Sequence, residues 1–349
     1  MSAPARIDPA AAKAAAEKAL AEAAAAEAEL AAALGRLAPR FAPGAEGVQG
    51  LTRLSGGASQ ETWAFRAGDR DLILRRRPAA ARPGGEGLPL DVEAELIARA
   101  GEQGAPVPGV VLRLAPEHRA GVGFVMDRVP GETLPARILR KPEFAGARAV
   151  FAAEAGAILA AIHRADGTGL GLETHTPETA LARLAGRHKE FGQDRPVFDL
   201  AFRRLAETAP ATRAPRLLHG DFRMGNILFG PDGVRAVLDW EMAHLGDPMS
   251  DFGWVCMGSW RFGGEGPVGG CGAREDMWAA YEAAGGEPVD PKSARWWETF
   301  AALHWGVIIE RMGAWIRAGA DFSVERHVIA RRASETELLL IADLTGREI

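Results

Sequence analysis

The sequence predicts an α+β chain in which a small antiparallel β lobe precedes a larger, mainly helical lobe. Two observations lead to this fold class. Between Val48 and Val129, short β-prone runs alternate with glycine- and proline-containing turns, a pattern typical of hairpins. After Pro130, apolar residues recur at helical spacing, and this part of the chain carries eight of the nine tryptophans. The linker between the lobes is expected near residues 127–131.

The composition is that of an ordinary globular protein. Of 349 residues, 47% are hydrophobic and 25% are charged, and the net charge is −5. This balance argues against a nucleic-acid-binding protein and against a polybasic membrane-binding surface. No uninterrupted apolar run approaches the roughly 20 residues of a membrane span. The two cysteines, Cys256 and Cys271, are too few for a disulfide scaffold, so a cytoplasmic location is expected.

Two residue types are unusually scarce. Only five of the 41 basic residues are lysines, and none lies between residues 19 and 140. The chain contains a single asparagine, Asn226. Both scarcities narrow the choice of residue for any role that needs a lysine or an asparagine.

Residues 1–35 differ in character from the rest, because 18 of the 35 are alanines. Alanine is the best helix former, so we expect a helix from Pro9 to Leu34 that ends at Gly35. Its large apolar residues, sparse for a core face, are Leu20, Leu30 and Leu34. Two interpretations stay open: an exposed helical extension, and a helix that acts as a lid or pairs with a second copy in a homodimer.

The β lobe is expected over residues 36–130. Clusters of glycine, serine and proline separate its elements, and the first three strands form an antiparallel meander. A loop rich in proline and glycine covers residues 76–90. The expected strands are 48–54, 62–65, 71–75, 107–114 and 123–129, with one helix over 91–100.

The helical lobe is expected over residues 131–349. The stretch 147–163 is apolar at helical spacing. Five tryptophans of this lobe are candidates for an aromatic substrate wall, although aromatic residues at helical spacing more often belong to a core. They are Trp260, Trp296, Trp297, Trp305 and Trp315.

One predicted hairpin in this lobe indicates where functional residues come together. The apolar runs 227–229 and 234–238 flank Gly230-Pro-Asp-Gly233, which is a turn sequence. Because a hairpin folds back on itself, we expect Asp239 to lie beside the loop that precedes the first run.

That loop has the spacing of a phosphoryl-transfer site. His219 and Asp221 form a His-x-Asp motif, and Asn226 follows Asp221 by five residues. A carboxylate can orient a hydroxyl nucleophile and accept its proton, and an amide oxygen with a second carboxylate, here Asp239, can hold Mg²⁺. The alternative is a histidine and an aspartate that only bind turn backbone groups. The position of the sole asparagine at the required offset disfavours that alternative.

These residues carry a resemblance to a known family. The segment from His219 to Leu228, His-Gly-Asp-Phe-Arg-Met-Gly-Asn-Ile-Leu, and the later Leu-Asp-Trp-Glu and Gly-Asp-Pro-Met-Ser-Asp motifs resemble the aminoglycoside phosphotransferase family of small-molecule kinases. In finer detail they resemble the branch associated with acyl-CoA dehydrogenases. The resemblance covers about residues 48–340 and implies a bilobal, protein-kinase-like fold that uses ATP and Mg²⁺.

The resemblance also implies roles for individual residues. Asp221 would be the catalytic base, and Asn226 and Asp239 would be the metal ligands. His219 would brace the catalytic loop and Arg223 would line it. Asp251 resembles the family's buried acid that anchors this loop, although a helix N-cap is an alternative for it.

The nucleotide site would draw on the β lobe. The segment containing Gly56, Gly57 and Ser59 resembles the family's nucleotide loop, in which glycines let backbone N–H groups approach phosphates. The family places a lysine on the third strand, whereas this chain offers Arg75. Arginine binds phosphate oxygens bidentately, so Arg75 could contact the nucleotide phosphates in place of a lysine. A solvated run of three arginines is the alternative.

Three further residues complete the implied nucleotide site. Glu93 on the following helix would be the acidic partner of Arg75, with Glu95 as its competitor. The backbone of Asp127 to Val129, at the hinge, would contact the adenine.

The resulting expectation is an ATP-dependent kinase that phosphorylates a hydroxyl of a small molecule. The branch resemblance favours a hydroxyacyl-CoA as acceptor, and an aminoglycoside, another amino alcohol such as choline, or a sugar is the alternative. A nucleotide-binding pseudokinase that acts as a scaffold is a second alternative, supported only by Arg75 in place of lysine. Neither nucleic acid nor a membrane is expected as a partner.

Overall fold

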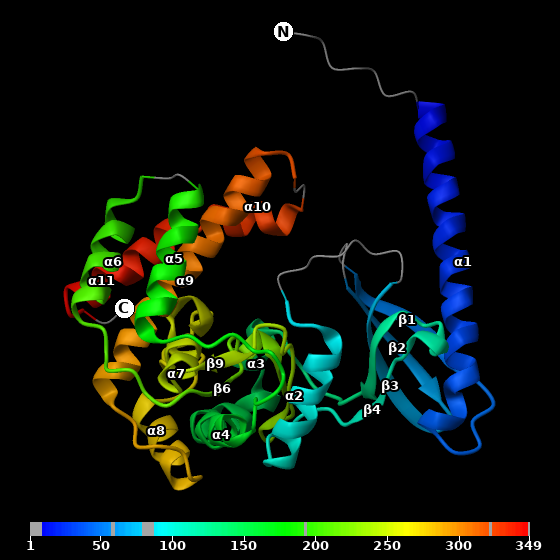
Figure 1. The fold of residues 1–349 in the computed structure, drawn as a ribbon, viewed down its shortest axis with the longest axis horizontal. Coiled ribbons are helices and arrows are strands. Elements are labelled where there is room, and N and C mark those ends of the chain that lie inside the picture. The colour runs from blue at the N-terminus through cyan, green and yellow to red at the C-terminus, as the bar shows by residue number, and fades with distance from the viewer. Residues whose placement is uncertain (1–8, 57–59, 79–86, 192–193, 321–322, 348–349) are drawn as a thin grey trace. The chain divides into compact units, whose positions relative to one another are not determined.

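The computed structural model describes residues 9–56, 60–78, 87–191, 194–320 and 323–347. The chain divides into two compact units (Figure 1). The first unit comprises residues 1–86 and 109–128, and the second comprises residues 87–108 and 129–349. The first contains an antiparallel sheet and the second is mainly helical, which confirms the α+β fold class.

The first unit is built on a five-stranded sheet in the order β1-β2-β3-β5-β4, and each neighbouring pair is antiparallel. The meander of the first three strands is therefore confirmed. Gly68 makes the tight turn between β2 and β3 with a φ of 60°, which glycine adopts without strain. The strands are β1 (Gln49–Gly56), β2 (Glu61–Ala67), β3 (Arg70–Arg77), β4 (Val110–Arg113) and β5 (Val122–Asp127).

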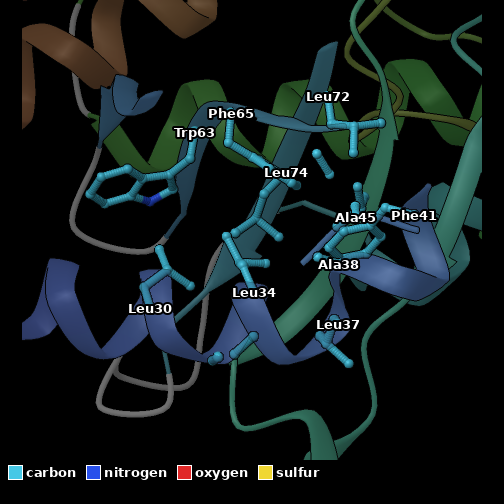
Figure 2. Packing of buried hydrophobic residues seen from close by; sticks show 14 of the residues in the cluster. Leu30, Leu34, Leu37, Ala38, Phe41, Ala45, Trp63, Phe65, Leu72 and Leu74 are labelled. Atoms are coloured by element: carbon cyan, nitrogen blue, oxygen red, sulfur yellow. The ribbon is translucent and has the colours of Figure 1, made fainter. Parts of the chain in front are cut away.

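Helix α1 (Pro9–Phe41) corrects the prediction for the N-terminal segment, because it continues through Gly35 and Pro39 instead of ending at Gly35. Its apolar stripe also continues past that point. Figure 2 shows Leu30, Leu34 and Phe41 pointing toward the side chains of the sheet. The exposed fractions of Leu30 and Leu34 are 2% and 0%.

The packing of α1 explains why the helix passes a glycine. From residue 30 onward, large and small apolar residues recur three and four positions apart, which places one stripe against the sheet. Burial of that stripe outweighs the roughly 1 kcal/mol that a glycine costs inside a helix. In the first part of α1, Leu20 is 71% exposed, so both interpretations of that part stay open. The last third is a structural part of the first unit.

The second unit contains two short antiparallel pairs. Strand β6 (Arg216–Leu218) pairs with β9 (His244–Gly246), and β7 (Ile227–Phe229) pairs with β8 (Val234–Val237). The second pair is the predicted hairpin. The described α-helices of this unit are α2 (Leu90–Glu102), α3 (Pro135–Arg140), α4 (Ala145–Arg164), α5 (Pro177–Phe191), α6 (Pro196–Glu207), α7 (Met249–Cys256), α8 (Arg274–Ala283), α9 (Pro291–Arg317), α10 (Val324–Ala330) and α11 (Ala333–Leu344).

Helix α4 packs mainly against α8. The segment Pro142–Arg164 is long and apolar enough to match a membrane span, and 56% of its most apolar window is buried inside the structure. Gly156 brings α4 against α8, because a Cβ at this position would lie 2.1 Å from the backbone oxygen of Met277. The apolar character of α4 is thus accounted for by packing within the unit.

Candidate functional site

The β7–β8 hairpin follows residues 219–226, the predicted catalytic loop, and lies beside it as the spacing predicts. We refer to residues 219–226 as the catalytic loop. Ile227 pairs with Val237, and the backbone N–H of Leu238 donates to the backbone oxygen of Asn226 over 2.8 Å. The end of β8 is thereby fastened to the end of the catalytic loop. Asp239 follows directly after this contact.

Asp251 fastens the start of the same loop. Its carboxylate is 1% exposed and accepts the backbone N–H groups of His219 over 2.8 Å and Gly220 over 2.9 Å. Burial by itself would raise the pKa of Asp251, but hydrogen bonding and the charges of His163 and His219 hold it below its ordinary value. Asp251 lies in the first turn of α7, yet it binds the loop and does not cap its own helix.

A buried histidine supports this anchor. His163, at the end of α4, contacts Asp251 Oδ2 through Nε2 over 3.2 Å and the hydroxyl of Tyr281 through Nδ1 over 3.0 Å. Tyr281 is the only tyrosine in the chain. Hydrogen bonds thus connect Tyr281 on α8 to His163 on α4 and to Asp251 on α7, which binds the catalytic loop. Sequence spacing could not reveal these bonds, because they join residues 88 and 118 positions apart.

His219 is buried and braces the loop from within. Burial is the largest effect on its pKa and lowers it, although the carboxylates around it act in the opposite direction. Its Nε2 donates to the backbone oxygen of Leu238 over 3.0 Å, and its Nδ1 accepts the backbone N–H of Asp221 over 3.2 Å. The partners fix this tautomer, because the carbonyl can only accept and the amide can only donate. His219 thus joins the loop to the end of β8.

The carboxylate of Asp221 is held by three side chains. Oδ1 accepts from Arg223 Nε over 2.9 Å and from the indole N–H of Trp254 over 2.7 Å. Oδ2 accepts from Asn226 Nδ2 over 2.6 Å. The guanidinium of Arg223 also lies over the ring of Trp260, 4.8 Å from its centre. The sequence motif alone contains no signal for Trp254.

The two predicted metal ligands, Asn226 and Asp239, lie where the end of the loop joins the end of β8, and their binding of Mg²⁺ stays a prediction. Asn226 donates through Nδ2 to the backbone oxygen and Oδ2 of Asp221, an orientation that leaves its carbonyl oxygen for a cation. Asp239 adopts a φ of 65°, which is rare outside glycine and occurs at functional sites. Within the described ranges, no group of three or more His, Cys, Asp or Glu side chains could hold a metal. An amide oxygen and a carboxylate together with nucleotide phosphates suffice for Mg²⁺.

The aromatic wall is only partly as expected. Trp260 and Trp305 lie near the catalytic loop, since their ring centres are 4.8 Å apart and Trp260 is 5.7 Å from Trp254. Trp296 and Trp297 are instead core residues, with exposed fractions of 6% and 3%. Their indole N–H groups bind Leu205 and Asp247. Trp315 lies against Arg311 and Arg326.

In the first unit, β3 presents Arg75 and Arg76 differently. Arg75 is half-buried and donates from Nη2 to Gln60 over 3.1 Å. Arg76 forms an ion pair with Glu61 and lies over Trp63. The arginine run is therefore not a uniformly solvated edge, and Arg75 stays the predicted phosphate ligand.

The remaining predicted nucleotide residues are placed as follows. Gly56 ends β1, whereas Gly57 and Ser59 lie outside the described residues. Glu93 on α2 is fully buried, and its pairing with Arg75 stays a prediction.

Two backbone N–H groups of the predicted hinge segment already donate hydrogen bonds within the protein. The N–H of Asp127 donates to Gly109, and the N–H of Arg128 donates to Asp71. Contact of this segment with adenine stays a prediction.

The sequence matches a described family over most of its length. A model of the "Phosphotransferase enzyme family" matches residues 50–297. Acyl-CoA dehydrogenase family member 11 of Rattus norvegicus is 30% identical over 243 residues, which cover 64% of this chain and 30% of that protein. Family member 10 of Mus musculus is 27% identical over 224 residues, which cover 60% and 20%. The chain thus spans less than a third of these curated relatives.

Solved structures share the fold. A Ralstonia eutropha protein provisionally described as an aminoglycoside phosphotransferase has a TM-score of 0.71 at 21% identity, over 91% of this chain and 98% of that one. A thermostable mutant of aminoglycoside phosphotransferase APH(4)-Ia, in complex with AMP-PNP and hygromycin B, has a TM-score of 0.58 at 18% identity, over 89% and 99%. A choline/ethanolamine kinase family protein from Mesorhizobium loti has a TM-score of 0.54 at 20% identity, over 89% and 99%. The likeness establishes a kinase-like fold.

Proposed function

The chain belongs to the phosphotransferase enzyme family, and on this basis we propose that it is a kinase that transfers the γ-phosphoryl group of ATP to a hydroxyl of a small molecule. The observation that carries the proposal is the arrangement of Asp221. Its carboxylate is fixed by three donors. The loop that bears it is fastened at its start by Asp251 and at its end by the backbone bond between Leu238 and Asn226.

This arrangement suits a general base. Asp221 would orient the acceptor hydroxyl and take its proton as the oxygen attacks the γ-phosphorus and the bond to ADP breaks. Since such reactions need little covalent chemistry from the protein, most of the rate would come from positioning. The three donors would prevent the carboxylate from rotating away from the hydroxyl.

The nucleotide would be held by the residues that the sequence predicts for this role. Arg75 would contact the phosphates, with Glu93 as its acidic partner, and Asn226 and Asp239 would hold Mg²⁺. The ion, when bound, supplies positive charge that offsets the charge developing on the phosphate oxygens. A structural neighbour with the same fold was solved with AMP-PNP, which supports a nucleotide as donor.

The acceptor class that we favour is a hydroxyacyl-CoA. The curated relatives carry names of acyl-CoA dehydrogenase family members, which supports an acyl-CoA ligand. The rival is an aminoglycoside, suggested by the neighbour solved with hygromycin B. Fold alone does not decide between them.

Replacing Asp221 by Asn tests the proposal. The variant removes the base while keeping the shape of the side chain, so we expect ATP-dependent phosphorylation to fall by about 10²–10⁴-fold. The matched control is Asp232→Asn in the turn of the β7–β8 hairpin, where the side chain is 92% exposed. Acceptors are screened among hydroxyacyl-CoAs and aminoglycosides by ATP consumption.

The outcomes are distinct. Loss of activity in Asp221→Asn with an unchanged melting temperature, and full activity in Asp232→Asn, support a kinase. Equal turnover by Asp221→Asn and the unmodified protein contradicts the role of Asp221. Nucleotide binding without turnover of any acceptor in the unmodified protein would favour the pseudokinase scaffold.

A further inference from the structure

A cavity lies in the second unit beside the glycine-rich segment 262–272. Its volume is about 490 Å³, within the range of sites that bind small molecules. One wall comes from the end of α3 and the first two turns of α4, and the other comes from residues 262–266, 270 and 271. Because all of these residues belong to the second unit, that unit forms the cavity by itself.

The glycine-rich wall is a tightly folded part of the chain. Gly266 pairs with Gly270, and Val268 pairs with Gly272, in two antiparallel bridges. A Cβ on Gly266 would overlap the backbone nitrogen of Gly272, so this fold requires glycine. A Cβ on Gly272 would lie 2.6 Å from that of Ala152, which shows how closely the segment packs on α4. The glycines thus give the cavity a defined wall.

Phe262 joins this cavity to the catalytic loop. It lines the cavity, and its ring centre is 6.1 Å from that of Trp260. The guanidinium of Arg223, which donates to Asp221, lies over the ring of Trp260. The backbone of Phe262 has a φ of 50°, a rare conformation for a bulky residue and one that concentrates at functional sites. Two side chains, Trp260 and Arg223, thus link the cavity to the predicted general base.

The opposite wall carries two arginines. Arg148 is half-buried, and its Nη1 donates to the backbone oxygens of Ile138 over 2.7 Å and Lys141 over 2.8 Å. These bonds hold the guanidinium in place without neutralising its charge. Arg140 is exposed, and in the described part of the chain its side chain forms neither a hydrogen bond nor an ion pair. Both positive charges can therefore serve a bound anion.

The other titratable groups of the cavity do not cancel this charge. Among the described residues that line it, Glu265 is the one acid, and it is exposed and pairs with neither arginine. Burial raises the pKa of the Cys271 thiol to about 11, although Arg148 acts in the opposite direction. The thiol is therefore neutral near pH 7, and the lining keeps an excess of positive charge.

We propose that this cavity binds a phosphate-bearing part of the acceptor, with Arg140 and Arg148 on the phosphate and Phe262 against the carbon-containing part next to it. The proposal rests on the kinase function above and narrows its acceptor to molecules that carry a phosphate at some distance from the hydroxyl. Guanidinium groups bind phosphate oxygens through charge-assisted hydrogen bonds. A hydroxyacyl-CoA has this form, whereas a polycationic aminoglycoside would meet like charge at the arginines.

Protection of Cys271 tests where the ligand binds, because Cys271 lines the cavity and Cys256 does not. The probe is 3-hydroxybutyryl-CoA, with AMP-PNP and Mg²⁺ present to keep its adenine out of the nucleotide site. At about ten times its Kd, the probe should slow alkylation of Cys271 by iodoacetamide by about tenfold, because only the free protein reacts. Peptide mass spectrometry measures the rate. An unchanged rate at saturating probe overturns the proposal.

Neutralising an arginine tests the charge. Arg140→Gln should weaken binding of 3-hydroxybutyryl-CoA by about tenfold, the effect of one charge-assisted hydrogen bond. Arg203→Gln, which removes the same charge from an exposed position on α6, is the control and should bind as the unmodified protein does. Isothermal titration calorimetry, again with AMP-PNP and Mg²⁺, measures the affinities. Equal affinities in the two variants contradict the proposal.

Two further ligands identify the group that is bound and separate this proposal from the kinase function. The N-acetylcysteamine thioester of 3-hydroxybutyrate lacks the phosphates, and free 3-hydroxybutyrate carries only a carboxylate. Weaker binding of both than of 3-hydroxybutyryl-CoA, with a smaller difference in Arg140→Gln, supports the phosphate site even if no acceptor is phosphorylated. Binding of free 3-hydroxybutyrate or of kanamycin that is tighter than that of 3-hydroxybutyryl-CoA overturns it.

Discussion

The indole N–H of Trp254 donates a hydrogen bond to Oδ1 of Asp221 over 2.7 Å. Trp254 lies three residues after Asp251 on α7, so both side chains leave the same face of that helix. Asp251 holds the backbone at the start of the catalytic loop, and Trp254 holds the carboxylate that the loop presents. One helix therefore sets both the position of the loop and the orientation of its functional group.

Replacing Trp254 by Phe removes this hydrogen bond and keeps most of the ring. Since one of three donors to Asp221 is lost, we expect kcat to fall by about tenfold, the effect of one hydrogen bond to a charged group. Steady-state kinetics with saturating ATP measure it. Trp296→Phe, which loses a bond to the backbone of Leu205 in the core, is the control and should keep its kcat. An equal fall in both variants would show that only stability has changed.

Arg75 on β3 is the predicted phosphate ligand, at the position where the family resemblance implies a lysine. Arg75→Ala should raise the KM for ATP by about tenfold or more, because a charge-assisted contact to phosphate is lost. Arg75→Lys keeps the charge and should have a smaller effect. Arg66→Ala on β2, a residue with a side chain 59% exposed, is the control. A KM for ATP that is the same in Arg75→Ala and Arg66→Ala would remove Arg75 from the nucleotide site.

Two leucines on α1 separate its packed part from its exposed part. Leu34→Ala should lower the free energy of unfolding by about 2–5 kcal/mol, because Leu34 is fully buried against the sheet. Leu20→Ala, at a position that is 71% exposed, should change it by less than about 0.5 kcal/mol. Urea denaturation measures both values. Equal effects would mean that α1 does not pack on the sheet in solution.

His304 makes stability depend on pH in a defined window. Its folded-state pKa of about 3 lies below the ordinary value of 6.5, so its contribution is fully present above pH 6.5. As the pH falls from 6.5 toward 3, the unfolded chain takes up a proton that the folded chain cannot, and stability drops by up to about 1.4 kcal/mol per pH unit. His304→Gln removes this group.

We therefore expect a shallower decline of the free energy of unfolding in His304→Gln than in the unmodified protein over that window. Between pH 7 and 8 the difference between the two proteins should stay constant. Parallel curves from pH 7 to pH 5 would show that His304 can take up a proton in the folded state.

The functional loop could be predicted from local spacing, and the reason is physical. Its residues lie on one hairpin and one loop, so a turn sequence and fixed offsets suffice to bring Asn226 near Asp221 and Asp239 to the fastened end of β8. Helix propensity alone predicts an end of α1 at Gly35, but the helix continues to Phe41. The stripe that continues to Phe41 gains more from burial than glycine costs.

The sequence by itself determined the fold class, the phosphotransferase family and the loop that carries Asp221. Those features depend on residue type and short spacing. Only the tertiary structure decided what surrounds that loop: Trp254 on Asp221, His163 on Asp251, and His304 beside Trp254. These contacts join residues far apart in the chain, so helix packing, rather than any local pattern, brings them together.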